Sequence, residues 1–422
     1  MAIIDWNGRF SGDWSVATNW SSGTVPGSGD AAVINFLGPY TVTVSGADFA
    51  NSLAVNGDLV TLRENSGSLT IAGALRVDAG LAALNKANSI GSVNLAAGAE
   101  LAVGNAGALG TAAVTQTGGE LLATANETLT NALLLSGNST IAAAHGTTLN
   151  EKASDYHVSG GSTLNFGAPG QDGTVVWAAA GGSVTSPFPV VNVQAGMLKG
   201  ANDALSFLLG GAPVMVAAGA TLDLVGNSPG VTDLTGGGSV IDSGAATTLT
   251  LEAANFSGAI SGPLSLVAQG AVFLSGNNTY TGTTTIDSGV NFELGAGGTT
   301  GSIGGGTIVD KGALFIFRSN AITLTNAISG GGVLWQTGSG VTSINTANTY
   351  TGGSKLSAGT LAIGNGGALG TGTLRQSGGE LLATTNETLT TLSCCLERPS
   401  PRRTGRRSLK WRRVIASWGA RR

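Results

Sequence analysis

The sequence predicts an all-β solenoid, in which the chain winds through successive short parallel strands. Three observations carry this prediction. Glycine accounts for 69 of the 422 residues, and because each glycine inside a helix costs about 1 kcal/mol, a helical fold is disfavoured. Short β-rich runs recur roughly every ten residues, separated by the Gly, Asn, Asp and Ser that turns require. The chain also repeats itself at two spacings, which is typical of stacked repeats.

The composition excludes several classes of protein. Hydrophobic residues make up 42% of the chain and charged residues only 10%, the reverse of the balance in disordered chains. Collagen is excluded because Gly has no three-residue period and Pro numbers only 10. Both cysteines, Cys394 and Cys395, lie near the C-terminus, so the rest of the chain can form no disulfide, CxxC zinc site or cysteine nucleophile.

Residues 1–45 are predicted to form an N-terminal cap rich in tryptophan. Trp6, Trp14 and Trp20 are three of the seven tryptophans in the chain. The open end of a solenoid exposes unpaired backbone groups and apolar core, and an aromatic lid with a polar rim would cover both. Because exposed tryptophan faces also stack on sugars, a small carbohydrate-binding platform is the alternative.

The start of the chain, Met-Ala-Ile-Ile-Asp, lacks the basic region and apolar stretch of a Sec-type signal peptide. We therefore expect no Sec signal within this sequence, and the export route stays open. No apolar run is long enough for a transmembrane helix.

Residues 46–254 are predicted to form β-helix turns with degenerate repeats. Runs such as 59–62, 68–71 and 92–95 are rich in β-formers and bounded by turn residues. Evenly spaced short strands would also suit a sandwich, a barrel or a propeller. The internal repeats decide among these folds.

The clearest short repeat lies in residues 255–390. Asn-Thr-Tyr-Thr-Gly occurs at 278–282 and 348–352, and Ala-Ile-Ser-Gly precedes each copy, at 259–262 and 327–330. The spacing therefore drifts between 68 and 70 residues. Stacked turns tolerate such small insertions at their corners, whereas a propeller needs a stricter blade length.

A longer repeat aligns residues 104–130 with 364–390, with 20 of 27 positions identical. Both repeats favour a β-helix. At roughly 20 to 25 residues per turn, the body of the solenoid at 46–390 would make roughly 13 to 17 turns, each rising about 4.8 Å.

The short repeat resembles that of a known family. Ala-Ile-Ser-Gly followed by Asn-Thr-Tyr-Thr-Gly, and by Ser-Ala-Gly-Thr-Leu-Ala-Ile-Gly at 357–364, is similar to the autotransporter-associated β-strand repeat of bacterial surface proteins. The resemblance is clear over 255–390 and weaker over 90–254. It implies a right-handed parallel β-helix, secretion across the outer membrane, and a role in adhesion or as a stalk. It also implies an outer-membrane translocator or other secretion machinery, which we expect to lie outside this chain.

Residues 391–422 differ from everything before them. They carry nine Arg and one Lys but one acid, a net charge of +9, whereas residues 1–390 carry −13. Reading this stretch in a shifted codon frame permits Ala-Leu-Leu-Leu-Ser-Gly and Ala-Ala-Ala-His-Gly, which the first copy of the longer repeat has at 132–137 and 142–146. We interpret the tail as a frameshifted, non-native segment. The alternative is a basic arm for nucleic acid or anionic membranes, and no nucleic-acid partner is expected for the body.

A β-helix can also carry an active site that cleaves polysaccharides, so the acidic residues matter. Hydrolysis uses two carboxylates about 5 to 10 Å apart, which neighbouring turns supply only where their acids align. The spacing of Asp203, Asp223 and Asp242 could stack them on neighbouring turns, with Lys199 as the one nearby base. The preferred interpretation is that these are solvated acids at corners.

Other motifs are interpreted as turns. Gly-Asn-Ser-Pro-Gly at 226–230 matches a nucleophile elbow, but His145 and His157 both precede it, and Pro229 suits a turn. No third ligand accompanies the two histidines by spacing. The Gly-rich stretch at 364–370 lacks the Lys of a phosphate loop. We therefore predict no catalytic residue, no cofactor and no metal site.

Two further tryptophans occupy similar contexts, Trp177 after Gly-Thr-Val-Val and Trp335 after Gly-Gly-Val-Leu. The preferred interpretation is repeated packing at one strand position, and the alternative is an exposed aromatic row for a glycan. Under that alternative the candidate glycan contacts are Trp6, Trp14, Trp20, Trp177 and Trp335.

The sequence thus predicts a fragment of a secreted or cell-surface β-helical passenger that is adhesin-like and not an enzyme. It would act as a rigid stalk with a weak, multivalent binding surface. The expected partners are host or environmental glycans, or surface proteins. The alternatives are a β-helical enzyme that cleaves polysaccharides and a stalk without any ligand.

Overall fold

The computed structural model describes residues 1–8, 10–179 and 181–385. Strands make up 49% of the chain and helix 2%, and the strands wind into a parallel β-solenoid of about 18 turns. This confirms the predicted fold class. Many turns take about 20 residues, as from Lys355 to its ladder partner Arg375, which is the short end of the expected range. The tail at 391–422 and the last residues of the predicted 255–390 region lie outside the described residues.

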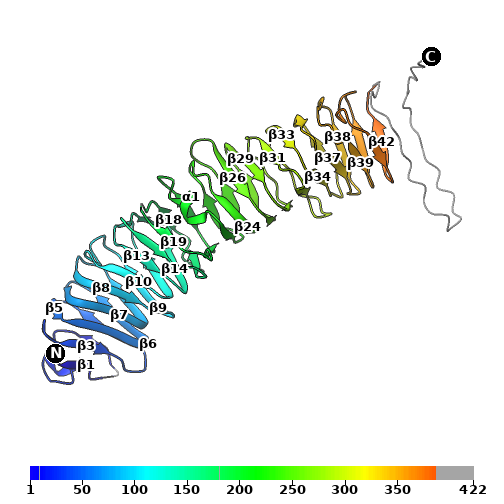
Figure 1. The fold of residues 1–422 in the computed structure, drawn as a ribbon. Coiled ribbons are helices and arrows are strands. Elements are labelled where there is room, and N and C mark those ends of the chain that lie inside the picture. Colours follow the sequence, from blue (N-terminus) through cyan, green and yellow to red (C-terminus); the bar gives the residue numbers. More distant parts are fainter. Residues whose placement is uncertain (9, 180, 386–422) are drawn as a thin grey trace, which may run out of the picture. The chain divides into compact units, whose positions relative to one another are not determined.

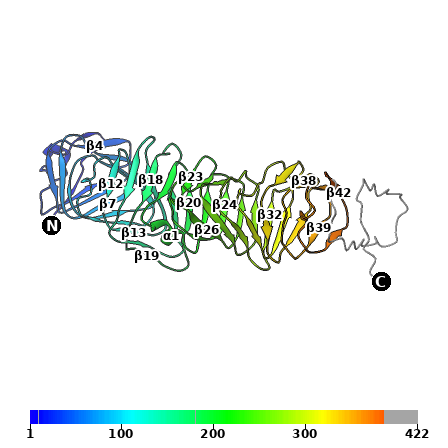
Figure 2. The same ribbon diagram turned by 90° about the horizontal axis from the view of Figure 1, so that it is seen from above.

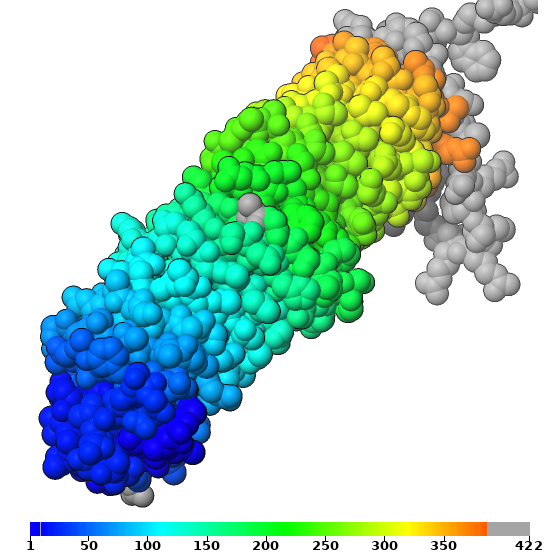
Figure 3. All heavy atoms as spheres, turned by 60° about the vertical axis from the view of Figure 1, so that its left-hand side comes forward, coloured from blue at the N-terminus to red at the C-terminus, as the bar shows by residue number. Residues whose placement is uncertain are grey.

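The chain divides into two compact units, Met1–Pro229 and Gly230–Arg422, called here the N-terminal and C-terminal units. The sequence-based boundary between 254 and 255 marks a change of repeat type and not this division. Within each unit the strands of successive turns lie side by side (Figures 1 and 2). Figure 3 shows the turns of the N-terminal unit as consecutive bands from blue to green.

Three parallel ladders build the N-terminal unit, together with β5 (Ala47–Ala50), which pairs with β7, and the short helix α1 (Ala204–Leu209). The first ladder comprises β1 (Ile3–Asp5), β3 (Ala31–Ile34), β6 (Ser52–Glu64), β7 (Ser68–Leu84), β8 (Ser89–Leu95), β10 (Ala113–Gln116), β13 (Leu133–Leu135), β16 (Tyr156–Val158) and β19 (Ser183–Val184). The second comprises β2 (Gly12–Asp13), β4 (Tyr40–Val44), the far ends of β6 and β7, β9 (Ala99–Val103), β11 (Gly119–Ala123), β14 (Asn138–Ala143), β17 (Thr163–Phe166), β20 (Val190–Val193) and β22 (Ala212–Val216). The third comprises β12 (Glu127–Leu129), β15 (Thr148–Glu151), β18 (Thr174–Trp177), β21 (Met197–Gly200) and β23 (Thr221–Asp223).

The C-terminal unit repeats this arrangement. Its first ladder comprises β24 (Gly230–Gly236), β27 (Ala254–Phe256), β30 (Val272–Leu274), β32 (Asn291–Leu294), β34 (Ala313–Ile316), β37 (Val333–Gln336), β39 (Ser354–Leu356) and β41 (Leu374–Gln376). Its second comprises β26 (Thr247–Leu251), β29 (Leu264–Ala268), β31 (Thr284–Ile286), β33 (Ile308–Asp310) and β36 (Ile328–Ser329). The remaining strands pair as β25 (Ser239–Ile241) with β28 (Ala259–Ser261), and as β35 (Ile322–Leu324), β38 (Val341–Ile344), β40 (Thr360–Ile363) and β42 (Glu380–Ala383).

The core is built mainly of stacked Val, Leu, Ile and Ala side chains that point inward from the strands, with buried aromatic rings such as those of Phe256 and Phe292 among them. Buried and exposed residues alternate along most strands, as the two-residue period of a strand requires. Polar ladders run between turns: the side-chain amide of Asn165 donates to Asn138 Oδ1 at 2.7 Å, and that of Asn192 donates to Asn165 Oδ1 at 3.0 Å. Each turn therefore binds the next through both backbone and side chains.

The short repeat encodes a buried corner. Asn278 and Asn348 are both buried, and their Oδ1 atoms accept the backbone N–H of Ile260 and Ile328 on the preceding turn, each at 2.8 Å. Two residues later in each copy, a buried tyrosine bonds through its hydroxyl to a Thr or Ser side chain within four residues. The motif is thus a device for joining turns.

Glycine is required at the end of each Ala-Ile-Ser-Gly copy. Gly262 and Gly330 both have φ of 102°, a conformation that favours glycine. A Cβ on either would lie within about 2.4 Å of a backbone carbonyl of the previous turn, at Asp242 or Asp310. The close stacking of turns excludes a side chain there.

The predicted cap is an aromatic cluster ahead of the first complete turn. β1 and β2 extend the ladders of β3 and β4, and Trp6 donates its backbone N–H to Val33 O. The ring of Trp20 meets those of Trp6 and Trp14 edge to face, with centroids 5.1 and 4.7 Å apart. Trp20 Nε1 also donates to Trp14 O at 2.7 Å, so the three rings form one closed core.

Candidate functional site

Four of the five tryptophans considered as glycan contacts are buried. Trp6, Trp14 and Trp177 are 0% exposed and Trp20 is 1% exposed, so none offers a ring face to a sugar. The glycan-contact alternative is therefore wrong for these four. These tryptophans are buried because their rings pack edge to face against other aromatic rings. Trp177 packs against Tyr156 and Phe166, as the three cap tryptophans pack against one another.

Trp177 and Trp335 do not share a packing position. Trp177 is the last residue of β18 and points inward, whereas Trp335 is the third residue of β37 and points outward. The residues before the two tryptophans are similar, but β18 begins at Thr174, three residues before Trp177, and β37 begins at Val333, two residues before Trp335. The prediction of repeated packing at one position is wrong, and Trp335 alone remains on the surface.

The interpretation of these residues as solvated corner acids is wrong for Asp223 and Asp242, which are 2% and 4% exposed, and Asp203 does not join them in a stack. Asp203 precedes α1 and accepts a hydrogen bond from Ser206 Oγ, off the ladders. Asp223 is buried on β23 opposite Lys199 on β21, with Lys199 Nζ 3.8 Å from its Oδ2. On the side of β21, the acid thus faces a base on the preceding turn.

The elbow-like stretch and the two histidines make hydrogen bonds to neighbouring side chains and backbone. Asn227 is buried and its Oδ1 accepts the backbone N–H of Leu205, while Ser228 donates its own N–H to Ser206 Oγ. His145 Nδ1 lies 2.7 Å from Asp172 Oδ1, and His157 Nδ1 bonds to Ser183 Oγ. Among residues 1–8, 10–179 and 181–385, no group of three metal-ligating side chains is gathered.

The outward face of the first ladder of the C-terminal unit carries a distinctive column of side chains. Register places them directly opposite one another on successive strands, from β30 to β41, with 18 to 22 residues between partners along this ladder. We call this the C-terminal column, and in order it comprises Phe273, Glu293, Phe315, Trp335, Lys355 and Arg375. It combines three outward aromatic rings with two adjacent bases.

Trp335 is the centre of this column. Its ring stacks on Phe315 with centroids 5.0 Å apart and planes 29° from parallel. Lys355 Nζ lies 4.3 Å from the ring centroid of Trp335, a cation–π contact. Trp335 Nε1 donates to Ser357 Oγ at 2.8 Å. These contacts fix the position of the Trp335 ring, and the ring in turn holds Lys355 in place.

The two bases stand next to each other without acids. Lys355 on β39 lies opposite Arg375 on β41, and like charges placed directly opposite destabilise a sheet. Within the described part of the chain neither base takes part in an ion pair. The acid of the column is Glu293, whose pKa burial raises above its ordinary value. The column thus runs from an acid to two uncompensated positive charges.

Hydroxyl groups border the column on the side where each strand ends. Thr337, Ser357 and Ser377 follow one another on successive turns, linked by backbone hydrogen bonds between the turns. Ser377 Oγ bonds to Ser357 Oγ at 3.4 Å. One turn further back, Phe317 is 39% exposed, with Gly297 against its ring. The face therefore offers aromatic, basic and hydroxyl groups together.

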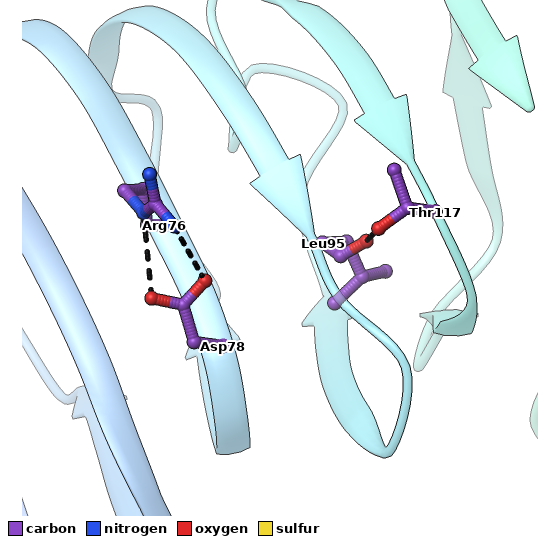
Figure 4. Close-up of polar contacts among 4 residues, drawn as sticks. All are labelled: Arg76, Asp78, Leu95 and Thr117. Carbon is purple, nitrogen blue, oxygen red and sulfur yellow. Dashed lines mark hydrogen bonds and ion pairs between the residues drawn. The ribbon is translucent and has the colours of Figure 1, made fainter.

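The equivalent face of the N-terminal unit looks different. Through the longer repeat, Arg375 corresponds to Thr115, and ladder register then extends the correspondence to earlier turns. We call this set the N-terminal column: Val33, Ala54, Arg76, Asn94 and Thr115. Its one base, Arg76, is held by Asp78 on the same strand through two hydrogen bonds of 3.2 and 3.3 Å (Figure 4). On a neighbouring turn of this unit, Thr117 Oγ1 donates to Leu95 O (Figure 4).

One pair of acids does align on neighbouring turns, and the sequence analysis missed it. Glu100 on β9 and Glu120 on β11 are ladder partners. Burial, with a contribution from the charge of Glu100, raises the pKa of Glu120 to about 7, and burial also raises the pKa of Glu100. The sequence spacing of Glu100 and Glu120, which equals one turn of the solenoid, is the signal that could have identified this pair.

Comparison with known proteins accounts for the corner motif. The family model of the passenger-associated-transport-repeat matches residues 269–290 and 334–363. The chain carries autotransporter passenger repeats. These segments include strands of the C-terminal column, among them β30, β37 and β39. Passengers of this kind are secreted or displayed on the cell surface, so the chain is a passenger-type β-helical surface protein.

A curated relative agrees with this assignment. The chain is 43% identical over 63 residues to the adhesin BmaC autotransporter of Brucella suis biovar 1 (strain 1330). The match covers 15% of this chain and 2% of that protein. No solved structure matches the chain. Over the described residues, no helix combines the length and apolar character needed to cross a membrane.

Proposed function

We propose that the chain is an adhesin-like section of a passenger, which binds extended surface polymers through the C-terminal column. The observation that carries the proposal is the outward stack of Phe315, Trp335 and Lys355 beside Arg375. Aromatic residues and Arg are enriched where proteins bind partners, and an exposed cluster of them on a surface is a sign of a binding site. The name of the matched relative, an adhesin, supports the same role.

The solenoid suits weak, multivalent attachment. Each turn adds one side chain to the column at the strand spacing of about 4.8 Å, so a long ligand meets several contacts in sequence. Contacts that are individually weak add up when they are linked in this way. The remainder of the solenoid would act as a stalk that holds the column in a fixed geometry.

Adhesion of coated beads tests the proposal. Beads bearing the full chain are applied to a panel of immobilised glycans and matrix proteins, and F273A/F315A/W335A is compared with the chain itself. We expect adhesion to at least one surface, and loss of most of it in the triple variant. F49A is the matched control, because Phe49 in the N-terminal unit is 44% exposed and Phe273 is 42% exposed. Equal adhesion by the triple variant would contradict the proposal.

Cleavage of polysaccharides is a second candidate, favoured by the Glu100–Glu120 pair. Paired carboxylates with one raised pKa are the arrangement that glycosidases use. We propose that the chain nevertheless binds without cleaving, because these acids lie on a different unit from the C-terminal column. Release of reducing ends from the glycan panel tests this. Release that E120Q abolishes, with the fold intact, would establish the enzyme instead.

A further inference from the structure

The C-terminal column has a charge pattern that narrows its ligand. Residues 1–390 carry a net charge of −13 and hold only ten bases. Two of these ten, Lys355 and Arg375, stand opposite each other on the outward face. Three other bases of the described chain are held in ion pairs: Arg76 with Asp78, Lys199 with Asp223 and Lys311 with Asp287. An acidic protein that keeps two uncompensated bases side by side has a local site for negative charge.

The site is organised before any ligand arrives. The Trp335 ring fixes Lys355 through the cation–π contact, and Trp335 is itself fixed by Phe315 and by the bond to Ser357. Holding groups in place in advance lowers the entropy lost on binding. Arg375 lies one turn further on and adds a planar fork of donors that suits a carboxylate.

The shape of the site favours an extended ligand over a compact one. Phe273, with 42% of its surface exposed, lies five turns from Arg375, and the rings of Phe315 and Trp335 lie between them. The hydroxyl groups of Thr337, Ser357 and Ser377 run parallel to this line. Apolar rings, hydroxyls and cations in a row match the C–H faces, hydroxyls and carboxylates of a linear sugar polymer.

Two other polyanions fit less well. Duplex nucleic acid carries about one charge per 1.7 Å, a density that two bases one strand spacing of about 4.8 Å apart do not match. An acidic peptide that adds as a strand needs a free sheet edge, but β39 is paired on both sides by β37 and β41. The surface is therefore open to side-chain contacts and closed to strand addition.

We propose that the C-terminal column binds a linear acidic polysaccharide, whose carboxylates pair with Lys355 and Arg375 while its sugar rings lie along Phe273, Phe315 and Trp335. This inference rests on the proposed binding role of the same column and names the ligand class. Because exposed ion pairs are screened by salt, the interaction should weaken as ionic strength rises.

A matched pair of polymers provides the test. Polygalacturonate and its fully methyl-esterified form share a backbone and differ in charge, and binding of the full chain to each is measured by calorimetry or biosensor. We expect polygalacturonate to bind about tenfold or more tightly than the ester, and added salt to weaken it. The variant K355N/R375T should lose about tenfold or more for polygalacturonate alone. Its new residues are those of the N-terminal column, Asn94 and Thr115, so the fold accommodates them.

The outcomes separate this inference from the binding role itself. Equal binding of both polymers by the chain, with no effect of K355N/R375T, would overturn the acidic preference and leave glycan binding in place. Binding of neither polymer would also overturn the inference, while bead adhesion lost in F273A/F315A/W335A would still support another ligand on this column. A retained fold in each variant is checked by circular dichroism.

Discussion

The N-terminal and C-terminal columns occupy equivalent positions on one fold yet differ in chemistry. At the position where one unit has Arg76 bonded to Asp78, the other has Trp335 stacked on Phe315. Asn94 and Thr115 correspond to Lys355 and Arg375. Inward residues are equivalent as well, and there both units hold small or branched apolar side chains. The solenoid is therefore a constant core whose outward columns vary independently, which is how one fold can carry a stalk and a binding surface.

The largest expected difference between the units is their response to pH. In the N-terminal unit, burial raises the pKa of Glu151 to about 8, and in the C-terminal unit burial raises the pKa of Asp310 to about 6. A carboxyl whose pKa is higher in the folded state binds more protons when folded, so stability falls as pH rises from its unfolded pKa to its folded pKa. The N-terminal unit should lose stability from about pH 4.5 to 8, and the C-terminal unit only from about pH 4 to 6.

The variant E151Q isolates this effect. It should raise the free energy of unfolding of the N-terminal unit at pH 8 by about 2 kcal/mol or more, since each pKa unit is worth about 1.4 kcal/mol. Hydrogen exchange on peptides of each unit, in a urea series, measures the two units separately. D310N is the matched control, with no effect expected on the N-terminal unit. Unchanged pH dependence in E151Q would refute the assignment.

Removing the central ring should affect stability more than removing its counterpart. W335A loses the stacking on Phe315, the cation–π contact with Lys355 and half-buried apolar surface, so we expect a cost of about 2 kcal/mol to the C-terminal unit. R76A loses one exposed ion pair and should cost about 0.5 kcal/mol or less in its own unit. Urea unfolding followed by hydrogen exchange measures both. Similar costs would mean that the two columns are structurally alike.

Transfer of the binding groups is a stricter test of equivalence. The variant A54F/R76W/N94K/T115R places the C-terminal chemistry on the N-terminal column. If ladder position and side-chain type suffice, calorimetry should show about twice as many polygalacturonate sites per chain. An unchanged stoichiometry in a folded variant would show that groups outside the columns are needed.

The smallest expected effect is that of R76A on binding. Because Arg76 is already satisfied by Asp78, its loss should leave the affinity for polygalacturonate unchanged within experimental error. The affinities of R76A and K355N/R375T for polygalacturonate are compared on the same biosensor surfaces. A loss as large as that of the double variant would move the binding site to the N-terminal unit.

Much of the fold was predictable, because the residues that join turns also repeat in the sequence. The buried Asn and Tyr of the corner motif recur with the same hydrogen bonds in both copies, and the glycines at the end of Ala-Ile-Ser-Gly recur with the same φ. Such positions are constrained by the neighbouring turn, so their pattern is visible without a structure. The cap was predictable for the same reason, as apolar rings at an open end must be covered.

The binding face was harder to predict because the period of the sequence repeat differs from the spacing of the stacked turns. The visible repeat spans 68 to 70 residues, but consecutive rungs are 18 to 22 residues apart, so a repeat does not return to the same ladder. β31 stacks with β29 and β33, whereas its counterpart in the second copy, β39, stacks with β37 and β41. Whether a side chain points inward or outward also depends on where its strand begins. For this reason Trp177 points inward and Trp335 points outward, although the residues before them are similar. A search at the rung spacing would have aligned Phe315, Trp335, Lys355 and Arg375.

Hydroxyl-radical footprinting in the presence of polygalacturonate tests the central claim most directly. The method reports the exposure of aromatic side chains, and Phe273 and Phe49 begin with nearly equal exposure on different units. We predict that the polymer reduces oxidation of Phe273, Phe315 and Trp335 and leaves that of Phe49 unchanged. Protection of Phe49 together with unaltered oxidation of Phe273 and Trp335 would contradict the account.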